Sequence, residues 1–167
     1  ISAGMDALVH TLESFMTTKA NPLTRALNRE AFILLWKNLP ALEKQSDDLN
    51  VYQNLLLGAY LAAAGLFNSG SGIAGGLSYP LGVHYHVPHG IGGGIFIADV
   101  IKFNVNRGWY DCAEFLDLIE SHPKWSRGEK AVRFSELLFE LRSKLNIPQY
   151  LTQWGITKNT VESVAQH

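Results

Sequence analysis

Apolar residues recur three and four positions apart along most of the chain, the spacing that places them on one face of an α-helix. The first such segment runs from Met5 to Met16 and is predicted to end before Asn21. Asn21 and Pro22 form a helix start, because Asn caps free backbone N–H groups and Pro suits the first helical position. The second predicted helix continues from there and stops at Pro40.

Further helices are predicted beyond a polar loop at 43–50. One runs over 49–67 and is apolar nearly all round in its second half, which is typical of a buried helix. The others are predicted at 90–103, 109–119 and 126–145, with short elements at 151–154 and 157–166. Strand-like alternation of apolar and polar residues is absent. The predicted fold class is therefore all-α, with one core and a single domain spanning residues 1–167.

Glycines are concentrated in one part of the chain, with 10 of the 15 lying between Gly65 and Gly94. Gly70, Gly72 and Gly75 match the G-x-G-x-x-G pattern of dinucleotide-binding folds. That pattern requires a preceding strand, whereas a long apolar helix is predicted here. We interpret these glycines instead as points of close approach, where a helix or a ligand contacts backbone that carries no Cβ.

The charge balance excludes some classes of protein. Fourteen Lys and Arg residues stand against 15 Asp and Glu, so the chain lacks the basic excess of a nucleic-acid binder. No window reaches the roughly 18 uninterrupted apolar residues of a membrane span. The single cysteine, Cys112, excludes an intramolecular disulfide and fits a reducing compartment. We expect a cytoplasmic protein that binds neither nucleic acid nor membrane.

Two clusters of residues carry potential chemistry. Asp6 and His10 are four positions apart on the first predicted helix and share a face, with Glu13 on the same side. A carboxylate and an imidazole one turn apart can ligate one divalent metal ion. The alternative interpretation is an exposed polar edge with a weak contact between the two side chains.

The second cluster consists of His84, His86 and His89, three histidines within six residues. Neutral imidazoles are the commonest metal ligands, and they also act as general acids or bases near neutral pH. The alternative is a polar loop with histidines at the surface. On these residues alone, both interpretations remain open.

Together these segments resemble a known family. Residues 4–10 read Gly-Met-Asp-Ala-Leu-Val-His, which resembles the Gly-Met-Asp-Ala-x-x-His signature of the iron-containing (group III) alcohol dehydrogenases. Asn21-Pro22, Pro-Leu-Gly at 80–82 and Val-Pro-His-Gly-Ile at 87–91 resemble further family segments in the same order. The resemblance spans residues 1–106. It implies the helical, bundle-like C-terminal domain of a two-domain enzyme of the dehydroquinate synthase-like superfamily.

The resemblance also implies an activity. The family oxidises alcohols or reduces aldehydes and ketones with NAD or NADP, using a divalent metal ion, iron or zinc. The nucleotide would bind to an N-terminal domain that is absent from this chain, so the chain alone is expected to be inactive and its cofactor-binding residues are unknown. The expected substrate is a small alcohol, aldehyde or polyol, and the expected assembly is a homo-oligomer.

The resemblance assigns the metal ligands residue by residue. The family holds its metal with one Asp and three His, of which Asp6, His10 and His89 match three. The remaining His is expected 14 residues before His89, where this chain has Gly75. His84 or His86 is a candidate replacement, and we take His84 as the fourth ligand.

A further family histidine, near the nicotinamide, falls at Tyr79, because Ser78-Tyr79-Pro80 stands in place of Ala-His-Pro. Tyr79 is therefore a candidate catalytic proton donor or relay, with a packing role as the alternative. Two other functions remain open. One is a non-redox relative similar to dehydroquinate synthase. The other is a non-catalytic helical domain with a degenerate metal site, for which Gly75 and Tyr79 are the argument.

Overall fold

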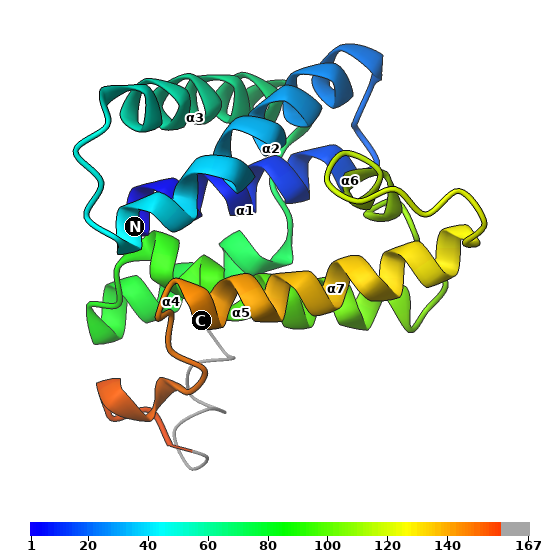
Figure 1. The fold of residues 1–167 in the computed structure, drawn as a ribbon. Coiled ribbons are helices and arrows are strands. Elements are labelled where there is room, and N and C mark those ends of the chain that lie inside the picture. The colour runs from blue at the N-terminus through cyan, green and yellow to red at the C-terminus, as the bar shows by residue number, and fades with distance from the viewer. Residues whose placement is uncertain (158–167) are drawn as a thin grey trace.

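The computed structural model describes residues 1–157, which form seven α-helices and one 3-10 turn and no strand (Figure 1). The elements are α1 (Ser2–Met16), α2 (Pro22–Glu43), α3 (Leu49–Ser69), α4 (Ile73–Tyr85), α5 (His89–Val105), α6 (Ala113–Leu116), α7 (Arg127–Lys144) and η1 (Leu151–Trp154). The all-α prediction is confirmed. The short helix predicted at 157–166 falls, apart from its first residue, outside the described residues.

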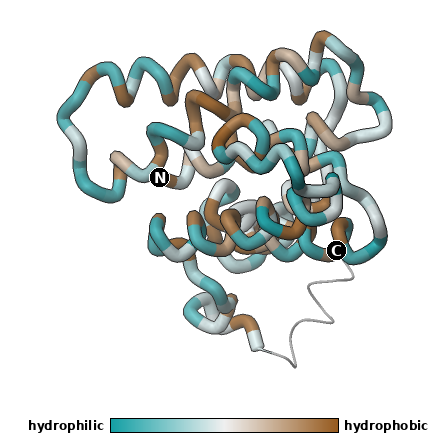
Figure 2. The backbone as a smooth tube through the Cα atoms, turned by 45° about the vertical axis from the view of Figure 1, so that its right-hand side comes forward, coloured by the Kyte–Doolittle hydropathy of each residue, from teal (hydrophilic) through white to brown (hydrophobic). Residues whose placement is uncertain are grey.

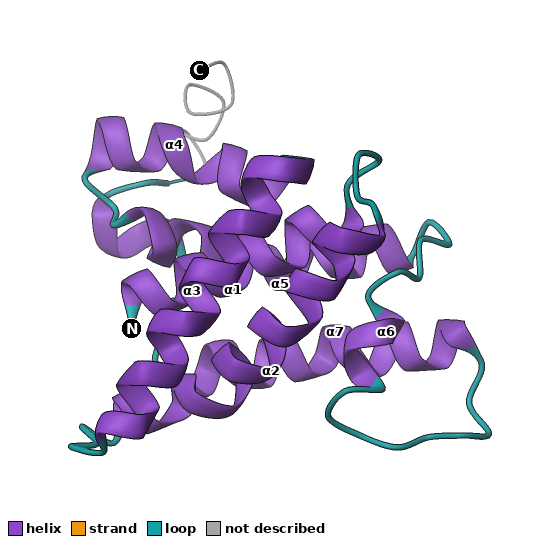
Figure 3. Cartoon of the chain, turned by 90° about the horizontal axis from the view of Figure 1, so that it is seen from above, coloured by secondary structure: helices purple, strands orange, loops and turns teal. Residues whose placement is uncertain are grey.

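α1 is the central helix of the fold. It packs against α2, α3, α4 and α5. In Figure 1 it lies between the α2–α3 pair and a layer formed by α4, α5 and α7. Its apolar face is fully buried at Leu8, Leu12 and Phe15, and these side chains join one main core. Figure 3 shows the same helices from above, with the loops at the ends of the helices.

The predicted start of α2 is confirmed, but its predicted end is wrong. The Asn21 side chain accepts hydrogen bonds from the backbone N–H groups of Leu23 and Thr24, as a capping residue should. The helix then passes through Pro40 and ends at Glu43. Pro40 lies in the last turn, where it removes one backbone hydrogen bond, and the buried Leu39 keeps this turn packed on the core.

Two other segments differ from the pattern-based prediction. The glycine-rich zone contains a complete helix, α4, which includes Pro80. The residues of α4 have low helix propensity, but packing against α5 stabilises the helix. This packing is close because Gly92 lets the Ser78 side chain approach the backbone of α5. The segment 109–119 contains only the four-residue α6, and the surrounding turns are tied to α7 by Arg127–Asp111 and Lys130–Asp117 contacts of 2.6 Å each.

Polar and apolar residues alternate along the helices (Figure 2), and the buried apolar residues form the shared core. Among the described residues, no single helix has the length and apolarity of a membrane span. Only α3 and α4 taken together meet that criterion, across a bend of 104°.

Candidate metal centre

Asp6, His10 and His89 come together at one place in the fold. Asp6 and His10 lie one turn apart on α1, and His89 is the first residue of α5. The Oδ1 atom of Asp6 lies 3.7 Å from the Nε2 atom of each histidine. Each of the three residues offers one ligand atom, and these atoms lie within 4.8 Å of one another. We call this set the three-residue cluster.

Close approach of α5 to α1 makes this arrangement possible. Gly90 follows His89 directly, and a Cβ atom at Gly90 would overlap the carbonyl oxygen of Ser2. A Cβ atom at Gly93, one turn further along α5, would lie 3.3 Å from the side chain of Val9 on α1, which is a tight contact without overlap. The interpretation of the glycines as contact points is thus correct for this helix pair, and the contact is what brings His89 beside Asp6.

The cluster is partly open to solvent. The side chain of His10 is 17% exposed, and those of Asp6 and His89 are 34% and 33% exposed. An ion held by these atoms would therefore have protein on one side and an accessible position on the other. A centre that acts on a small molecule needs such an open position.

Glu13 anchors α4 to α1 beside the cluster. Its side chain is buried, and its carboxylate accepts hydrogen bonds from the backbone N–H groups of Gly72, Ala74 and Gly75. These are free N–H groups of a helix N-terminus, which favours a negative charge. The glycine pattern at 70–75 therefore binds a carboxylate of the same chain, and the element before it is a helix, as predicted.

Two serines contact the histidines of the cluster. The Ser78 hydroxyl lies 2.7 Å from Nδ1 of His89, and the Ser71 hydroxyl lies 3.3 Å from Nδ1 of His10. The sequence pattern indicates no role for these serines, and for Glu13 it indicates only a position on the same side of the helix as Asp6 and His10. The spacing of Glu13, one turn after His10, was a usable sequence signal, whereas the serines are brought to the site only by the packing of α4.

The remaining predicted site residues lie at different distances from the cluster. Tyr79 is close, with its ring centroid 4.8 Å from that of His89, and it is exposed. His84 is also exposed but is not a member of the cluster, so its assignment as the fourth ligand is not supported. It comes six positions after Ser78, roughly one and two-thirds helical turns, and therefore lies on a different side of α4.

Gly75 borders the cluster where the fourth family ligand was expected. A Cβ atom at this position would lie 3.6 Å from Cε1 of His10. The family histidine is therefore absent from a position that does face the site, and no member of the described cluster replaces it.

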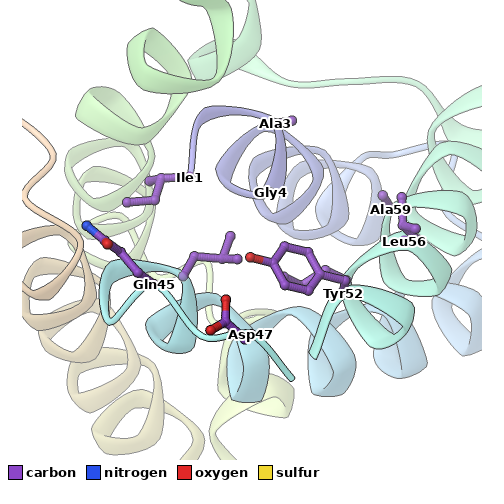
Figure 4. Close-up of a pocket in the computed structure, with 10 residues that line it drawn as sticks. Ile1, Ala3, Gly4, Gln45, Asp47, Tyr52, Leu56 and Ala59 are labelled. Carbon is purple, nitrogen blue, oxygen red and sulfur yellow. The ribbon is translucent and has the colours of Figure 1, made fainter. Parts of the chain in front are cut away.

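A pocket of about 530 Å³ lies elsewhere, between the start of α1, the end of α2 and α3. Figure 4 shows the side chain of Tyr52 lying across it, with Ile1 and Gln45 on one side and Leu56 and Ala59 on the other. None of the cluster residues lines this pocket. It is mainly apolar and contains no group of metal-ligating side chains.

Comparison with known proteins identifies the family. The family model described as "Fe-containing alcohol dehydrogenase family, C-terminal" matches residues 1–167. The chain belongs to this family. The resemblance found in residues 1–106 is thereby confirmed and extended over the whole sequence.

Similar proteins include several members of the family. Lactaldehyde reductase of Escherichia coli K12 is 29% identical over 99% of this chain and 43% of its own length. The 1,3-propanediol dehydrogenase of Citrobacter freundii is 27% identical over 93% of this chain and 40% of its own length. The crystal structure of a 1,3-propanediol oxidoreductase superposes with a TM-score of 0.92 at 24% identity, over 99% of this chain and 44% of that chain. The chain thus spans less than half the length of these relatives.

Proposed function

We propose that this chain supplies the metal- and substrate-binding part of an NAD- or NADP-dependent alcohol dehydrogenase. The reaction would be oxidation of a small alcohol or polyol, or reduction of an aldehyde or ketone. The observation that carries the proposal is the convergence of Asp6 Oδ1 with the Nε2 atoms of His10 and His89. Relatives named for lactaldehyde and 1,3-propanediol support the substrate class.

The cluster fits a divalent metal ion. Two imidazole nitrogens and one carboxylate oxygen form the ligand set of several catalytic zinc centres, which leave a further position open, and of non-haem Fe(II) centres. The presence of Gly75 in place of a histidine is therefore compatible with metal binding, and the donor set suits iron and zinc alike. When bound, such an ion supplies Lewis-acid polarisation of the alcohol or carbonyl oxygen.

We assign distinct tasks to the residues of this chain. Asp6, His10 and His89 hold the ion, and the accessible side of the cluster receives the substrate oxygen. Tyr79 donates or relays a proton at that oxygen through its hydroxyl, because its exposed ring lies against that of His89. Glu13 holds the N-terminus of α4 next to these groups through hydrogen bonds from backbone N–H groups.

The other half of the enzyme would be a nucleotide-binding domain that precedes this chain. The extra length of the relatives supports this arrangement. We further propose a homo-oligomer in the cytoplasm. Large exposed apolar side chains on α3, such as Leu56, Tyr60 and Phe67, support association. The single thiol, Cys112, is buried, and burial raises its pKa to about 12, which makes it an unreactive thiol.

Calorimetric titration of Zn²⁺ into the metal-free chain tests the proposed ligands. We expect one ion to bind per chain, and we expect His89→Ala to weaken binding at least about tenfold because one of three ligands is lost. The control is His122→Ala, since His122 stacks on Trp125 and pairs with Glu120 away from the cluster. Equal weakening in both variants, or no binding by the wild type, would contradict the proposal.

Turnover by the full product of the reading frame tests the proposed reaction. We expect metal-dependent formation of NADH or NADPH from 1,2- or 1,3-propanediol, followed by nicotinamide absorbance. Tyr79→Phe keeps the ring and removes the hydroxyl, so kcat should fall by roughly 100-fold if Tyr79 transfers the proton. A metal-loaded protein without turnover on any small alcohol would favour the non-catalytic alternative.

A further inference from the structure

The three-residue cluster has one protein ligand fewer than the family resemblance implies, which is one Asp and three His. Gly75 stands at the position of the remaining His. A Cβ atom at Gly75 would lie 3.6 Å from Cε1 of His10, the ring carbon next to Nε2. Position 75 therefore borders the ligand atoms and contributes no donor of its own.

The polar side chains next to Gly75 are already engaged within the chain. The buried carboxylate of Glu13 accepts hydrogen bonds from three backbone N–H groups at the start of α4 and from the Ser71 hydroxyl. The single proton of this hydroxyl is thereby used. Within the part of the chain that the structure describes, the group of potential ligand atoms includes neither Glu13 nor His84.

An ion at the cluster would therefore have coordination positions that the protein does not fill. Catalytic zinc ions with three protein ligands expand from four to five ligands, and Fe(II) centres with two His and one carboxylate keep several positions open. The side chains of Asp6 and His89 are 34% and 33% exposed, so small molecules can reach the cluster. A substrate alcohol needs one open position for its reacting oxygen, and a further position remains.

We infer that Gly75 is a specificity-determining position, because the missing side chain leaves room at the cluster for a second substrate oxygen. The site then selects compounds that carry oxygens on two neighbouring carbon atoms. Vicinal diols and α-hydroxy aldehydes or ketones are such compounds, and their two oxygens are close enough to bind one ion together. This inference rests on the proposed function and narrows its substrate class.

The second oxygen binds at little additional cost in entropy. Once the first oxygen is bound, the second is held close to the ion, so its effective concentration is high. Two hydroxyls that bound independently would raise the affinity only about twofold, whereas joint binding raises it about tenfold or more. A mono-alcohol leaves the second position to water. An imidazole at position 75 would fill that position and remove the advantage of the diol.

The test compares 1,2-propanediol with 1-propanol as ligands of the full product of the reading frame, loaded with Co²⁺ and without nucleotide. Co²⁺ replaces Zn²⁺ because its visible absorption changes with the number and kind of its ligands. We expect the diol to change this absorption and to bind at least about tenfold more tightly than the mono-alcohol. A preference of about twofold or less overturns the inference.

A side chain at position 75 gives a second readout. Gly75→His is combined with Ser71→Ala, because the Ser71 hydroxyl would lie 2.9 Å from the new Cβ atom. In this double variant we expect Co²⁺ binding to persist and the preference for the diol to fall to about twofold or less. Ser71→Ala alone is the matched control, since it lacks the same hydroxyl and should keep the preference. Full preference in the double variant overturns the inference, and the wild-type comparison decides if that variant does not fold.

Metal binding separates this inference from the proposed function. If the wild type binds neither Co²⁺ nor Zn²⁺, the proposed function fails and the inference fails with it. If the wild type binds metal and does not distinguish the two alcohols, the inference fails while the proposed function stands.

Discussion

Two consecutive regions of this chain are held together by different forces. Residues 49–98, which form α3, α4 and the first half of α5, contain no Asp, Glu, Lys or Arg. The following region, up to the end of α7, is rich in charge, and ion pairs such as Arg127–Asp111 and Arg133–Glu120 link its elements. Both regions contribute side chains to the main apolar core, but the first adds close backbone contacts at glycines to it, whereas the second adds ion pairs.

This difference predicts how well each region tolerates substitutions. Exposed ion pairs are screened by water and contribute little individually, so the charged region can lose one without much effect. A substitution at a closely packed glycine is tolerated less well, because the neighbouring atoms leave no space for a Cβ atom. One member of the candidate metal centre, His89, lies in this intolerant region, and the other two, Asp6 and His10, are supplied by α1.

The largest expected effect breaks the backbone contact itself. In Gly90→Ala the new Cβ atom overlaps the carbonyl oxygen of Ser2, so α5 must move away from α1. We expect a loss of about 3 kcal/mol in the free energy of unfolding, measured by urea denaturation. The matched control is Gly76→Ala on α4, where no atom lies within 4 Å of the new Cβ atom. This change should stabilise by about 0.5–1 kcal/mol. Equal effects in the two variants would remove the basis of the comparison.

An intermediate effect is expected at Glu13, whose buried carboxylate accepts hydrogen bonds from backbone N–H groups of α4. Glu13→Gln removes the buried charge and turns a donating NH₂ group toward backbone N–H groups of α4. We expect a loss of about 2 kcal/mol in unfolding free energy, since these are hydrogen bonds to a charged acceptor. Glu30→Gln, at an exposed position on α2, should change stability by less than about 0.5 kcal/mol. If Glu13→Gln behaves like this control, α4 is not held by the carboxylate.

The smallest effect is expected in the charged region. Arg133 pairs with Glu120 and Glu140, and its removal in Arg133→Ala should lower unfolding free energy by less than about 1 kcal/mol, with a smaller difference at high salt. Hydrogen bonds from His122 and Arg133 hold the pKa of Glu120 below its ordinary value. The contribution of Glu120 to the free energy of unfolding is therefore fully present above the ordinary carboxylate pKa. It is lost as the pH falls through the lowered pKa of Glu120. A loss as large as that of Gly90→Ala would contradict the proposed tolerance.

Sequence patterns predicted the helices where packing and propensity agree. The cap at Asn21, the helical face shared by Asp6 and His10, and the start of α5 to within one residue were accessible because each depends on neighbours within a few positions. Local spacing is sufficient for such features.

Other features could not be predicted because distant contacts determine them. α4 is rich in glycine and contains Pro80, and it is helical because α5 packs on it and Glu13 caps it. The choice of His84 as a ligand relied on its closeness to His89 in sequence, whereas the group of potential ligand atoms that the fold brings together contains Asp6, His10 and His89. Hydrogen bonds such as that between Ser78 and His89 require the folded chain.

The close contacts around Gly75 have a consequence for which side chains this position can carry. A Cβ atom there would lie 2.9 Å from the Ser71 hydroxyl and 3.1 Å from Oε2 of Glu13. Any side chain at position 75 must therefore displace Ser71 from its place between Glu13 and His10. A fourth ligand at position 75 would therefore take the place of the Ser71 hydroxyl beside Glu13 and His10, so the site has either this serine contact or the family's fourth histidine.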